Sequence, residues 1–273
     1  MKIHVLGVTG MLGCYIFKYL SKCGYCVVPY TRRDIDALSV TNITFKCELL
    51  PDDVIINCVG LLKPNIKRDE DAIKVNCDFP YMLEQIAGAT GCRLINFSSD
   101  CVFNGSKGNY SEKDECDARD IYGVTKTHAN LQSTVLRLSF IGEELYNKIG
   151  LLEFALKNAN KSVTGYTNCL WNGVTGLEIA KIIEKMLRND GVSFWSGVRH
   201  VYSDRVVSKY EILSIIDAIY NLNLEIIPTQ ATEICGTLIE NTLDRSLITV
   251  YNKIQVPTLE EMIYEQRNFI YEN

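Results

Sequence analysis

The chain has 273 residues, a length that suits one large domain or two small ones. Hydrophobic residues make up 47% and charged residues 22%, which is typical of a globular protein and excludes a disordered one. A net charge of −5 offers no basic surface to nucleic acid. No apolar run approaches the roughly 18 residues that span a bilayer, and the N-terminus lacks a signal-peptide core. We therefore expect a cytoplasmic protein that binds neither membrane nor nucleic acid.

The first half of the chain alternates short apolar runs with longer amphipathic ones. The runs predicted as strands are residues 3–6, 25–30, 54–59, 93–98 and 134–138. The predicted helices are residues 12–20, 71–87, with a break near Pro80, and 122–131. The run 54–59 is apolar apart from Asn57, as expected at the centre of a parallel sheet that is covered on both faces. Strands that alternate with helices predict an α/β fold, a Rossmann-type doubly wound parallel sheet.

The pattern changes after about Gly142. Helices are predicted at residues 151–156, 177–187, 210–220 and 257–271, and short strands near 199–202 and 225–227. We expect residues 1–142 to form the Rossmann domain. Residues 143–273 are expected to form a smaller α/β lobe that binds the substrate and interleaves with the sheet.

The cysteines do not form a metal-binding pattern. The chain has eleven of them, and the only close pair is Cys23 and Cys26, spaced C-x-x-C. That spacing also occurs in redox and zinc sites, but no second such pair and no histidine pair follows. We expect free thiols in a reducing compartment and no bound metal.

A glycine-rich turn, Gly7-Val8-Thr9-Gly10-Met11-Leu12-Gly13, lies between the first predicted strand and the first predicted helix. Glycines here allow the backbone to approach a pyrophosphate, and the helix N-terminus offers N–H groups and a positive dipole end. Glycines also make turns without any ligand, but this position after the N-terminal strand favours a dinucleotide site. The residues expected to bind the dinucleotide are Gly7, Thr9, Gly10, Met11, Leu12 and Gly13.

The second predicted strand is followed by Thr31, Arg32 and Arg33. A site selective for NAD places a carboxylate at this strand end, where it accepts a hydrogen bond from the ribose 2′-hydroxyl. A guanidinium at the same place pairs with the 2′-phosphate of NADPH. We therefore expect NADPH in preference to NADH; the alternative is that both arginines are solvated loop charges.

Ser99 ends a predicted strand, and Tyr122 and Lys126 follow at a spacing that places both on one face of a helix. A free phenol has a pKa near 10 and is a weak acid at neutral pH, but a neighbouring ammonium lowers that pKa. Ser99 is suited to hold a substrate carbonyl, and Tyr122 to protonate its oxygen while hydride arrives at carbon. Lys126 also suits the ribose hydroxyls of the cofactor.

These motifs together carry a family resemblance. The glycine spacing resembles the extended short-chain dehydrogenase/reductases. The segments Ser98-Ser99-Asp100-Cys101-Val102-Phe103-Asn104-Gly105 and Tyr122-Gly123-Val124-Thr125-Lys126 resemble the dTDP-4-dehydrorhamnose reductases and their relatives that act on UDP-linked 6-deoxy sugars. Asn57-Cys58-Val59-Gly60 resembles the cofactor loop of that family, and Asn76 its Val-Asn helix motif. Segments near residues 150–180 resemble the branch whose substrates include UDP-2-acetamido-4-keto sugars. The resemblance implies reduction of a UDP- or dTDP-linked 4-keto-6-deoxyhexose. It also implies that the protein forms a homodimer, as expected for the superfamily.

Three positions depart from the family pattern. Ala129-Asn130 replaces the usual Gly-Glu, which puts a metal-bridged dimer in doubt. Cys101 replaces a tyrosine, as in the GDP-fucose synthases and the plant-type epimerase/reductases of UDP-rhamnose synthesis. The resemblance implies that its thiol moves protons at C3 or C5 of the sugar, with Lys157 as the partner group and His200 as a weaker candidate. The alternative is that Cys101 fills space.

Two other functions stay open for this sequence. One is an epimerase or dehydratase that retains its NAD and recycles the hydride. The other is a non-catalytic NADP-binding regulatory subunit on the same scaffold, like the regulatory subunit of methionine adenosyltransferase. The fold alone does not separate them from the reductase.

Overall fold

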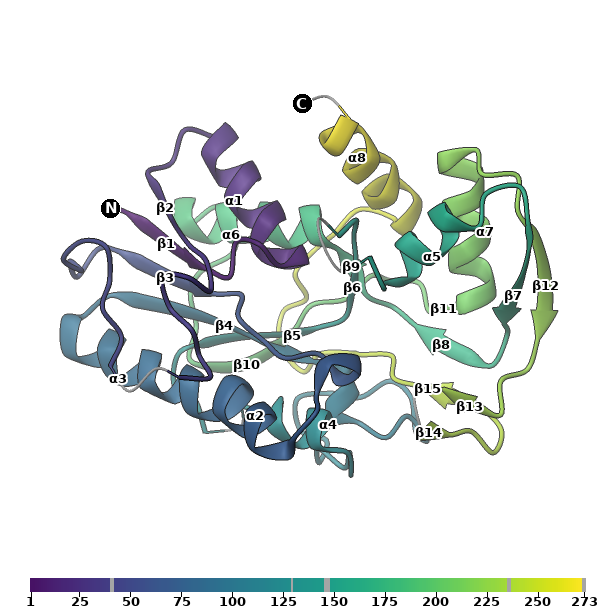
Figure 1. Ribbon diagram of the computed structural model, residues 1–273, viewed down its shortest axis with the longest axis horizontal. Helices are drawn as coiled ribbons and strands as arrows, with labels where there is room; N and C mark the ends of the chain where they lie inside the picture. The colour runs from purple at the N-terminus through teal and green to yellow at the C-terminus, as the bar shows by residue number, and fades with distance from the viewer. Residues whose placement is uncertain (40–41, 129, 145–147, 235–236, 272–273) are drawn as a thin grey trace.

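The computed structural model describes residues 1–39, 42–128, 130–144, 148–234 and 237–271 (Figure 1). A six-stranded sheet, parallel throughout, forms its centre. From one edge to the other the strands are β10 (Gly197–His200), β5 (Thr134–Leu138), β4 (Arg93–Ser99), β3 (Val54–Asn57), β1 (Ile3–Leu6) and β2 (Val27–Tyr30). Every residue of β1, β3 and β5 is buried, the polar His4 and Arg137 included, as expected for strands of a sheet that is covered on both faces. The predicted doubly wound α/β fold is confirmed.

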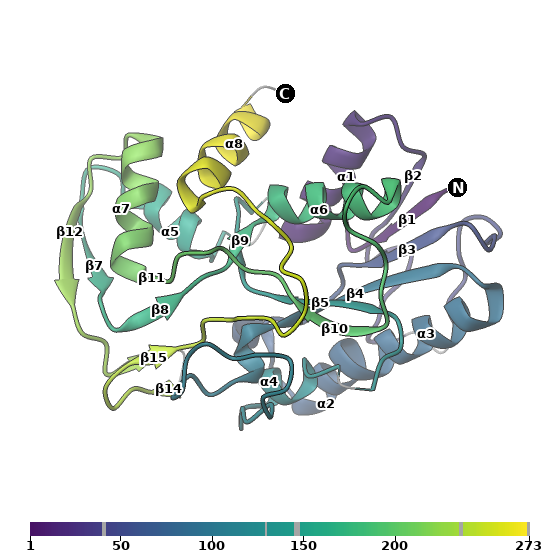
Figure 2. The ribbon, with the colours of Figure 1, turned by 180° about the vertical axis from the view of Figure 1, so that it is seen from behind.

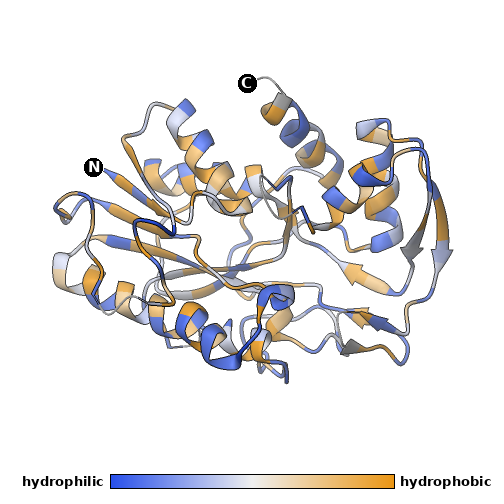
Figure 3. Ribbon diagram, in the orientation of Figure 1, coloured by the Kyte–Doolittle hydropathy of each residue, from blue (hydrophilic) through white to orange (hydrophobic). Residues whose placement is uncertain are grey.

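Helices cover both faces of this sheet (Figure 2). The helices on one face are α1 (Met11–Lys22) and α6 (Gly176–Arg188), and those on the other are α2 (Asp69–Ile73), α3 (Phe79–Thr90) and α4 (Ile121–Thr125). Hydrophobic residues run along much of the central strands and line the inner sides of the helices (Figure 3). The largest core cluster lies on the α1 and α6 side. This core holds the carboxyl ends of the strands, where the candidate site lies.

The predicted helix 71–87 is interrupted as expected near Pro80. A π-helical turn, Lys74–Asp78, joins α2 to α3, and Pro80 lies in the first turn of α3. Proline is tolerated there because its missing N–H would have no intrahelical partner. Asn76 lies in the π-helical turn and is buried. Such turns often occur at functional sites.

The prediction of a helix over 122–131 is wrong in its length. Helix α4 ends at Thr125, and His128 adopts φ = 50°, which no right-handed helix accommodates. Residues 132 and 133 are then tied by their amides to the Glu84 carboxylate. The chain must enter β5 at Thr134, so this docking replaces the last turns that helix propensity favours.

The second half adds the remaining elements. The helices are α5 (Leu151–Lys157), α7 (Lys209–Tyr220) and α8 (Leu259–Tyr271), with short helical turns at Lys63–Asn65 and Asp100–Val102. The paired strands are β12 (Glu225–Thr229) with β7 (Ser162–Tyr166), β8 (Cys169–Trp171) with β11 (Val207–Ser208) and β15 (Leu243–Asp244), β6 (Phe140–Ile141) with β9 (Val174–Thr175), and β13 (Glu233–Ile234) with β14 (Thr237–Leu238). Strand β10 belongs to the central sheet and α6 packs on α1, although both come after residue 142. The division into a Rossmann domain and a substrate-binding lobe at residue 142 stays a prediction.

Candidate active site

The glycine-rich turn connects β1 to α1 and is shaped by close backbone contacts. Gly7 has φ = 80°, a conformation that favours glycine, and its N–H donates to the carbonyl of Tyr30 at 2.8 Å. A Cβ on Gly13 would collide with the carbonyl of Gly7. The N–H of Gly10 donates to the same carbonyl at 2.9 Å. The turn therefore depends on its glycines, as the sequence predicts.

The N-terminus of α1 is open to a ligand. Gly10 is its N-cap residue and has no side chain to accept from the first-turn amides. The amides of Met11 and Leu12 have no partner within a helix, because the first four N–H groups of any α-helix lack one. Thr9 and Gly10 are exposed at this end. Backbone donors and the helix dipole are therefore available here to an anion.

The turn lies where the strand order reverses. The chain passes from β1 to β2 on one side and then to β3 on the other. At such switch points, open α/β sheets bind ligands beyond the carboxyl ends of the strands. A Cβ on Gly7 would come within 3.2 Å of the Cys58 carbonyl and of Val59, so the loop after β3 borders the turn.

The loop 57–61 is held by two buried asparagines. Asn57 donates through Nδ2 to Oδ1 of Asn96 at 2.8 Å and accepts from the N–H of Val59 at 3.2 Å. Asn76 accepts from the N–H of Leu61 at 2.9 Å and donates to its carbonyl at 3.1 Å. These bonds fix the loop and leave Gly60 on the side of the site.

Lys126 lies against this loop. Its Nζ donates to the carbonyl of Phe97 at 2.6 Å and would lie 3.9 Å from a Cβ on Gly60. The residue is 9% exposed, and burial lowers the pKa of its ammonium to about 8. Burial also raises the pKa of the neighbouring Cys58 thiol, so that sulfur is uncharged. Lys126 is therefore a buried cation without a carboxylate partner among the described residues.

Ser99 and Tyr122 meet at the end of β4. The Ser99 Oγ accepts from the N–H of Cys101 and donates to Oδ1 of Asp100, both at 3.1 Å, and the Ser99 side chain lies beside the Tyr122 phenol. Asp120 caps α4 by accepting from the N–H of Gly123 at 3.1 Å, which orients the helix that carries Tyr122. The predicted Ser99 and Tyr122 pair is thus brought together.

The acidity of Tyr122 differs from the prediction. Burial raises the pKa of its phenol, and the charges of Cys101 and Asp100 raise it further. The expected lowering by Lys126 is not seen, because that ammonium donates to the Phe97 carbonyl instead. A neutral phenol beside Ser99 is suited to give a proton to a substrate oxygen.

Cys101 lies beside a cation that sequence reasoning missed. Burial, followed by the charge of Asp100, raises the pKa of its thiol to about 12. Nη1 of Arg245 lies 3.7 Å from its sulfur, and Nε of Arg245 donates to the carbonyl of Phe103 at 2.8 Å. No local motif marks Arg245, because it lies beyond the segments that carry the resemblance.

The two candidate partners of Cys101 have other contacts. Lys157 is exposed at the end of α5, and its ammonium donates to the carbonyl of Lys148. Within the described ranges no contact joins Lys157 to Cys101, and its assignment stays a prediction. His200 is buried at the end of β10, its Nδ1 lies 2.8 Å from the carbonyl of Ile248, and burial lowers its pKa to about 4. His200 is therefore a neutral side chain of the strand end.

The two arginines that follow β2 differ in their ion-pair partners. Nε of Arg32 pairs with Asp36 at 3.2 Å. The Arg33 guanidinium has no hydrogen-bond or ion-pair partner in the part of the chain that the structure describes. Thr31 instead donates to Asp34 through its N–H and its hydroxyl, at 2.7 and 2.9 Å. Of the two predicted arginines, only Arg32 is therefore paired with a carboxylate among the described residues.

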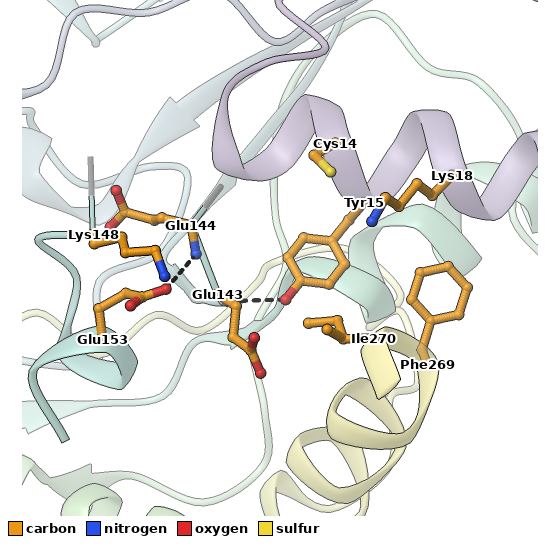
Figure 4. Close-up of a pocket in the computed structure, with 9 residues that line it drawn as sticks. All are labelled: Cys14, Tyr15, Lys18, Glu143, Glu144, Lys148, Glu153, Phe269 and Ile270. Atoms are coloured by element: carbon orange, nitrogen blue, oxygen red, sulfur yellow. Dashed lines mark hydrogen bonds between the residues drawn. The ribbon is translucent and has the colours of Figure 1, made fainter. Parts of the chain in front are cut away.

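A cavity of about 170 Å³ lies beside α1 (Figure 4). It is bordered by Tyr15 and by the carboxylates of Glu143, Glu144 and Glu153. Glu153 accepts from the N–H of Glu144 at 2.8 Å, and Glu144 accepts from the N–H of Gly150 at 2.7 Å. These carboxylates hold the chain before α5, and the cavity does not include Ser99 or Tyr122. A second cavity, of about 460 Å³, lies near Arg137 and also excludes them.

The described residues contain no group of three or more His, Cys, Asp or Glu side chains that could hold a metal ion. Cys23 and Cys26 are exposed free thiols, and Ala129 lies outside the described residues. No described helix is both long and apolar enough to cross a membrane.

The sequence is similar to a known protein family and to several curated proteins. Residues 1–236 match the family described as the RmlD substrate binding domain. Methionine adenosyltransferase 2 subunit beta from Bos taurus is 26% identical over 168 residues, which are 56% of this chain and 49% of that protein. dTDP-4-dehydrorhamnose reductase from Streptomyces griseus is 30% identical over 125 residues, 45% of this chain and 41% of that protein. The chain thus spans about half the length of the curated relatives that it matches.

A solved structure shares the fold over the whole chain. It is dTDP-4-dehydrorhamnose reductase from Bacillus anthracis in complex with NADP. The TM-score is 0.79 at 18% identity, covering 100% of this chain and 99% of that chain.

Proposed function

Because the chain belongs to the RmlD substrate binding domain family, we propose that it reduces the C4 ketone of a nucleotide-linked 4-keto-6-deoxyhexose with NADPH. The observation that carries this proposal is the position of Tyr122 beside Ser99 at the end of β4, with Lys126 buried nearby. The nucleotide is UDP or dTDP. The relatives from Streptomyces griseus and Bacillus anthracis are named as reductases of this kind, which supports the reaction class.

The residues present fit a dinucleotide. The turn that a Cβ on Gly13 would fill, together with the uncapped amides of Met11 and Leu12, suits the pyrophosphate. Arg33 suits a 2′-phosphate, and Lys126, which lies beside the loop at Gly60, suits the hydroxyls of the nicotinamide ribose. When bound, the nicotinamide supplies the hydride.

The chain's own side chains would then handle the proton. Ser99 donates a hydrogen bond to the ketone oxygen and holds the carbonyl in place. Tyr122, kept neutral by burial, gives its proton to that oxygen as negative charge develops. Lys126, with a pKa of about 8, is mostly protonated at neutral pH and suits the hydroxyls of the nicotinamide ribose.

We also propose that the same site epimerises the sugar at C3 or C5 and yields a 6-deoxy-L-sugar nucleotide. The 4-keto group acidifies the neighbouring hydrogens, and Cys101 lies two residues after Ser99. Arg245 beside the sulfur favours the thiolate, while burial opposes it. A thiol held protonated in this way is better suited to return a proton than to remove one.

The proposal is tested by NMR of the product formed from UDP- and dTDP-4-keto-6-deoxy sugars with NADPH in deuterated water. We expect a C4 alcohol from one of the two nucleotides, with solvent deuterium at C3 or C5. A reduced product without solvent deuterium contradicts the epimerisation and leaves the reductase. Failure to reduce either substrate contradicts the reductase itself.

The similarity to methionine adenosyltransferase 2 subunit beta supports a second candidate, a non-catalytic NADP-binding subunit. The presence of Ser99, Tyr122 and Lys126 favours catalysis, and turnover decides between the two. An NAD-retaining epimerase or dehydratase would instead release NAD when the purified protein is denatured. A homodimer is the proposed assembly, and sedimentation of the purified chain tests it.

A further inference from the structure

The carboxylate of Asp34 lies close in sequence to the strand end where a site selective for NAD uses a carboxylate. It follows β2, and such sites bind the ribose 2′-hydroxyl with a carboxylate at this strand end. In this chain Oδ2 of Asp34 already accepts two hydrogen bonds from Thr31, from the N–H at 2.7 Å and from the hydroxyl at 2.9 Å. One oxygen of the carboxylate is therefore occupied by its own turn.

Lys46 occupies the other oxygen. Its Nζ lies 3.1 Å from Oδ1 of Asp34, donates to the carbonyl of Pro29 at 2.6 Å, and lies 5.0 Å from the centre of the Tyr30 ring. The N–H of Lys46 donates to the Tyr30 hydroxyl at 3.0 Å, which fixes the backbone too. Thr31 and Lys46 together lower the pKa of Asp34, so the carboxylate is ionised and neutralised by the ammonium.

This arrangement borders the candidate dinucleotide site directly. The carbonyl of Tyr30 accepts from the N–H groups of Gly7 and Val8 at 2.8 and 3.2 Å, and the Thr31 turn begins at the next residue. The charges after β2 then pair off, Arg32 with Asp36 and Lys46 with Asp34. Among the described residues that follow β2, Arg33 has no ion-pair partner, so its charge is available to a ligand phosphate.

We propose that Lys46 is a positioning residue for cofactor selectivity, an inference that rests on the proposed NADPH-dependent function. By occupying Asp34, Lys46 prevents that carboxylate from accepting a ribose 2′-hydroxyl and cancels its repulsion of a 2′-phosphate. Selectivity for the phosphorylated cofactor thus depends on an ion pair 12 residues apart in sequence and not only on the arginines. Without Lys46, Asp34 is left as an ionised acceptor beside the ribose.

The test uses two fragments of the cofactor, 2′,5′-ADP and 5′-ADP, and needs no turnover. Their binding to the full chain is measured by calorimetry for wild type, Lys46→Met and Lys46→Arg. We expect Lys46→Met to lower the preference for 2′,5′-ADP by about tenfold, as loss of a charge-assisted contact does. Lys46→Arg should keep it. Lys46 is 42% exposed, so the substitution leaves the core intact.

Removal of the Asp34 carboxylate shows whether Lys46 acts through Asp34 or contacts the 2′-phosphate directly. If Lys46 acts through Asp34, the double variant Lys46→Met/Asp34→Asn should regain most of the wild-type preference for 2′,5′-ADP over 5′-ADP. The single variant Asp34→Asn should keep that preference. An unchanged preference in Lys46→Met, equal losses for both nucleotides, or a double variant no better than Lys46→Met would each overturn the inference. A wild-type chain that binds neither nucleotide would contradict the proposed cofactor itself, and with it this inference.

Discussion

Nη1 of Arg245 lies 3.7 Å from the sulfur of Cys101, although the two residues are 144 positions apart. The contact is supported on both sides: Nε of Arg245 donates to the Phe103 carbonyl, and the N–H of Asp244 donates to the Gly105 carbonyl at 2.7 Å. The end of β4 and the segment after β15 are thereby held together. The late part of the chain thus supplies a fixed positive charge to the candidate active site.

The first prediction concerns the proton donor. Tyr122→Phe removes the hydroxyl beside Ser99 but keeps the ring, so the fold should persist while turnover falls by about 10²–10⁴-fold. Ketone-dependent NADPH oxidation measures the loss, and near-UV circular dichroism checks the fold. Tyr81→Phe, at an exposed tyrosine on α3, is the matched control and should be active. Near-normal reduction by Tyr122→Phe would remove Tyr122 from the mechanism.

The second prediction concerns Cys101. Cys101→Ser replaces the thiol with a hydroxyl that ionises much less readily, so solvent deuterium should no longer enter at C3 or C5. Reduction of an already epimerised 4-keto substrate should persist, because it needs only Ser99, Tyr122 and Lys126. Mass spectrometry of the product measures both. Cys26→Ser, at an exposed thiol, is the control. Equal exchange in Cys101→Ser and wild type would assign the proton transfer to another group.

The third prediction separates the two arginines. Arg33→Ala should weaken NADPH binding by about 1.5–3 kcal/mol and leave NADH binding nearly unchanged, because a charge-assisted phosphate contact is lost. Arg32→Ala should have a smaller effect, since that guanidinium pairs with Asp36. Fluorescence titration of both cofactors measures the difference. The reverse order of effects would exchange the roles of the arginines, and equal losses for both cofactors would give them a structural role.

The fourth prediction concerns the glycine-rich turn. Gly13→Ala adds a Cβ that collides with the Gly7 carbonyl, a backbone atom that cannot move away. We expect a loss of about 1–3 kcal/mol in the free energy of unfolding, with weaker dinucleotide binding. Gly88→Ala, in α3 with open space around it, should instead stabilise by about 0.5–1 kcal/mol. Urea denaturation compares them, and a Gly13→Ala protein as stable as wild type would contradict the packing described.

The fifth prediction follows from the lowered pKa of Lys126. The folded-state pKa of about 8 lies below the unfolded value near 10.4, so burying the ammonium costs stability in full below pH 8. The cost declines as pH rises from 8 and vanishes above the unfolded pKa. Lys126→Met should therefore increase the free energy of unfolding at pH 7 by about 1–3 kcal/mol while abolishing reduction. Urea denaturation at pH 7 and near pH 10 measures it; an advantage that does not shrink at the higher pH would contradict this origin.

The sequence predicted those parts of the molecule that depend on local pattern. The strands at 3–6 and 134–138 were placed correctly, because each is a short, mostly apolar run bounded by turn residues. The glycine-rich turn was recognisable because its spacing serves a local backbone geometry. The helix predicted over 122–131 was too long. The N–H groups of Gln132 and Ser133 donate to the Glu84 carboxylate, and Glu84 lies 48 residues before Gln132, so no local pattern indicates this contact.

Arg245 and Lys46 could not be found in this way. Arg245 meets Cys101 only after β15 has docked beside the loop at Gly105, and no periodicity or motif encodes that contact. Lys46 reaches Asp34 from an irregular segment between β2 and β3. The sequence also indicated two arginines after β2, but it did not predict which of them pairs with a carboxylate. In the structure Asp36 pairs with Arg32, and among the described residues no carboxylate pairs with Arg33.

The outermost strand β10 has a consequence for synthesis. It pairs with β5, but its residues 197–200 follow β5 by about 60 positions in the chain. Until they leave the ribosome, β5 presents a hydrogen-bonding edge whose side chains are all apolar or buried in the finished protein. The nascent N-terminal half is thus expected to be prone to aggregation and to depend on chaperones until β10 closes the sheet.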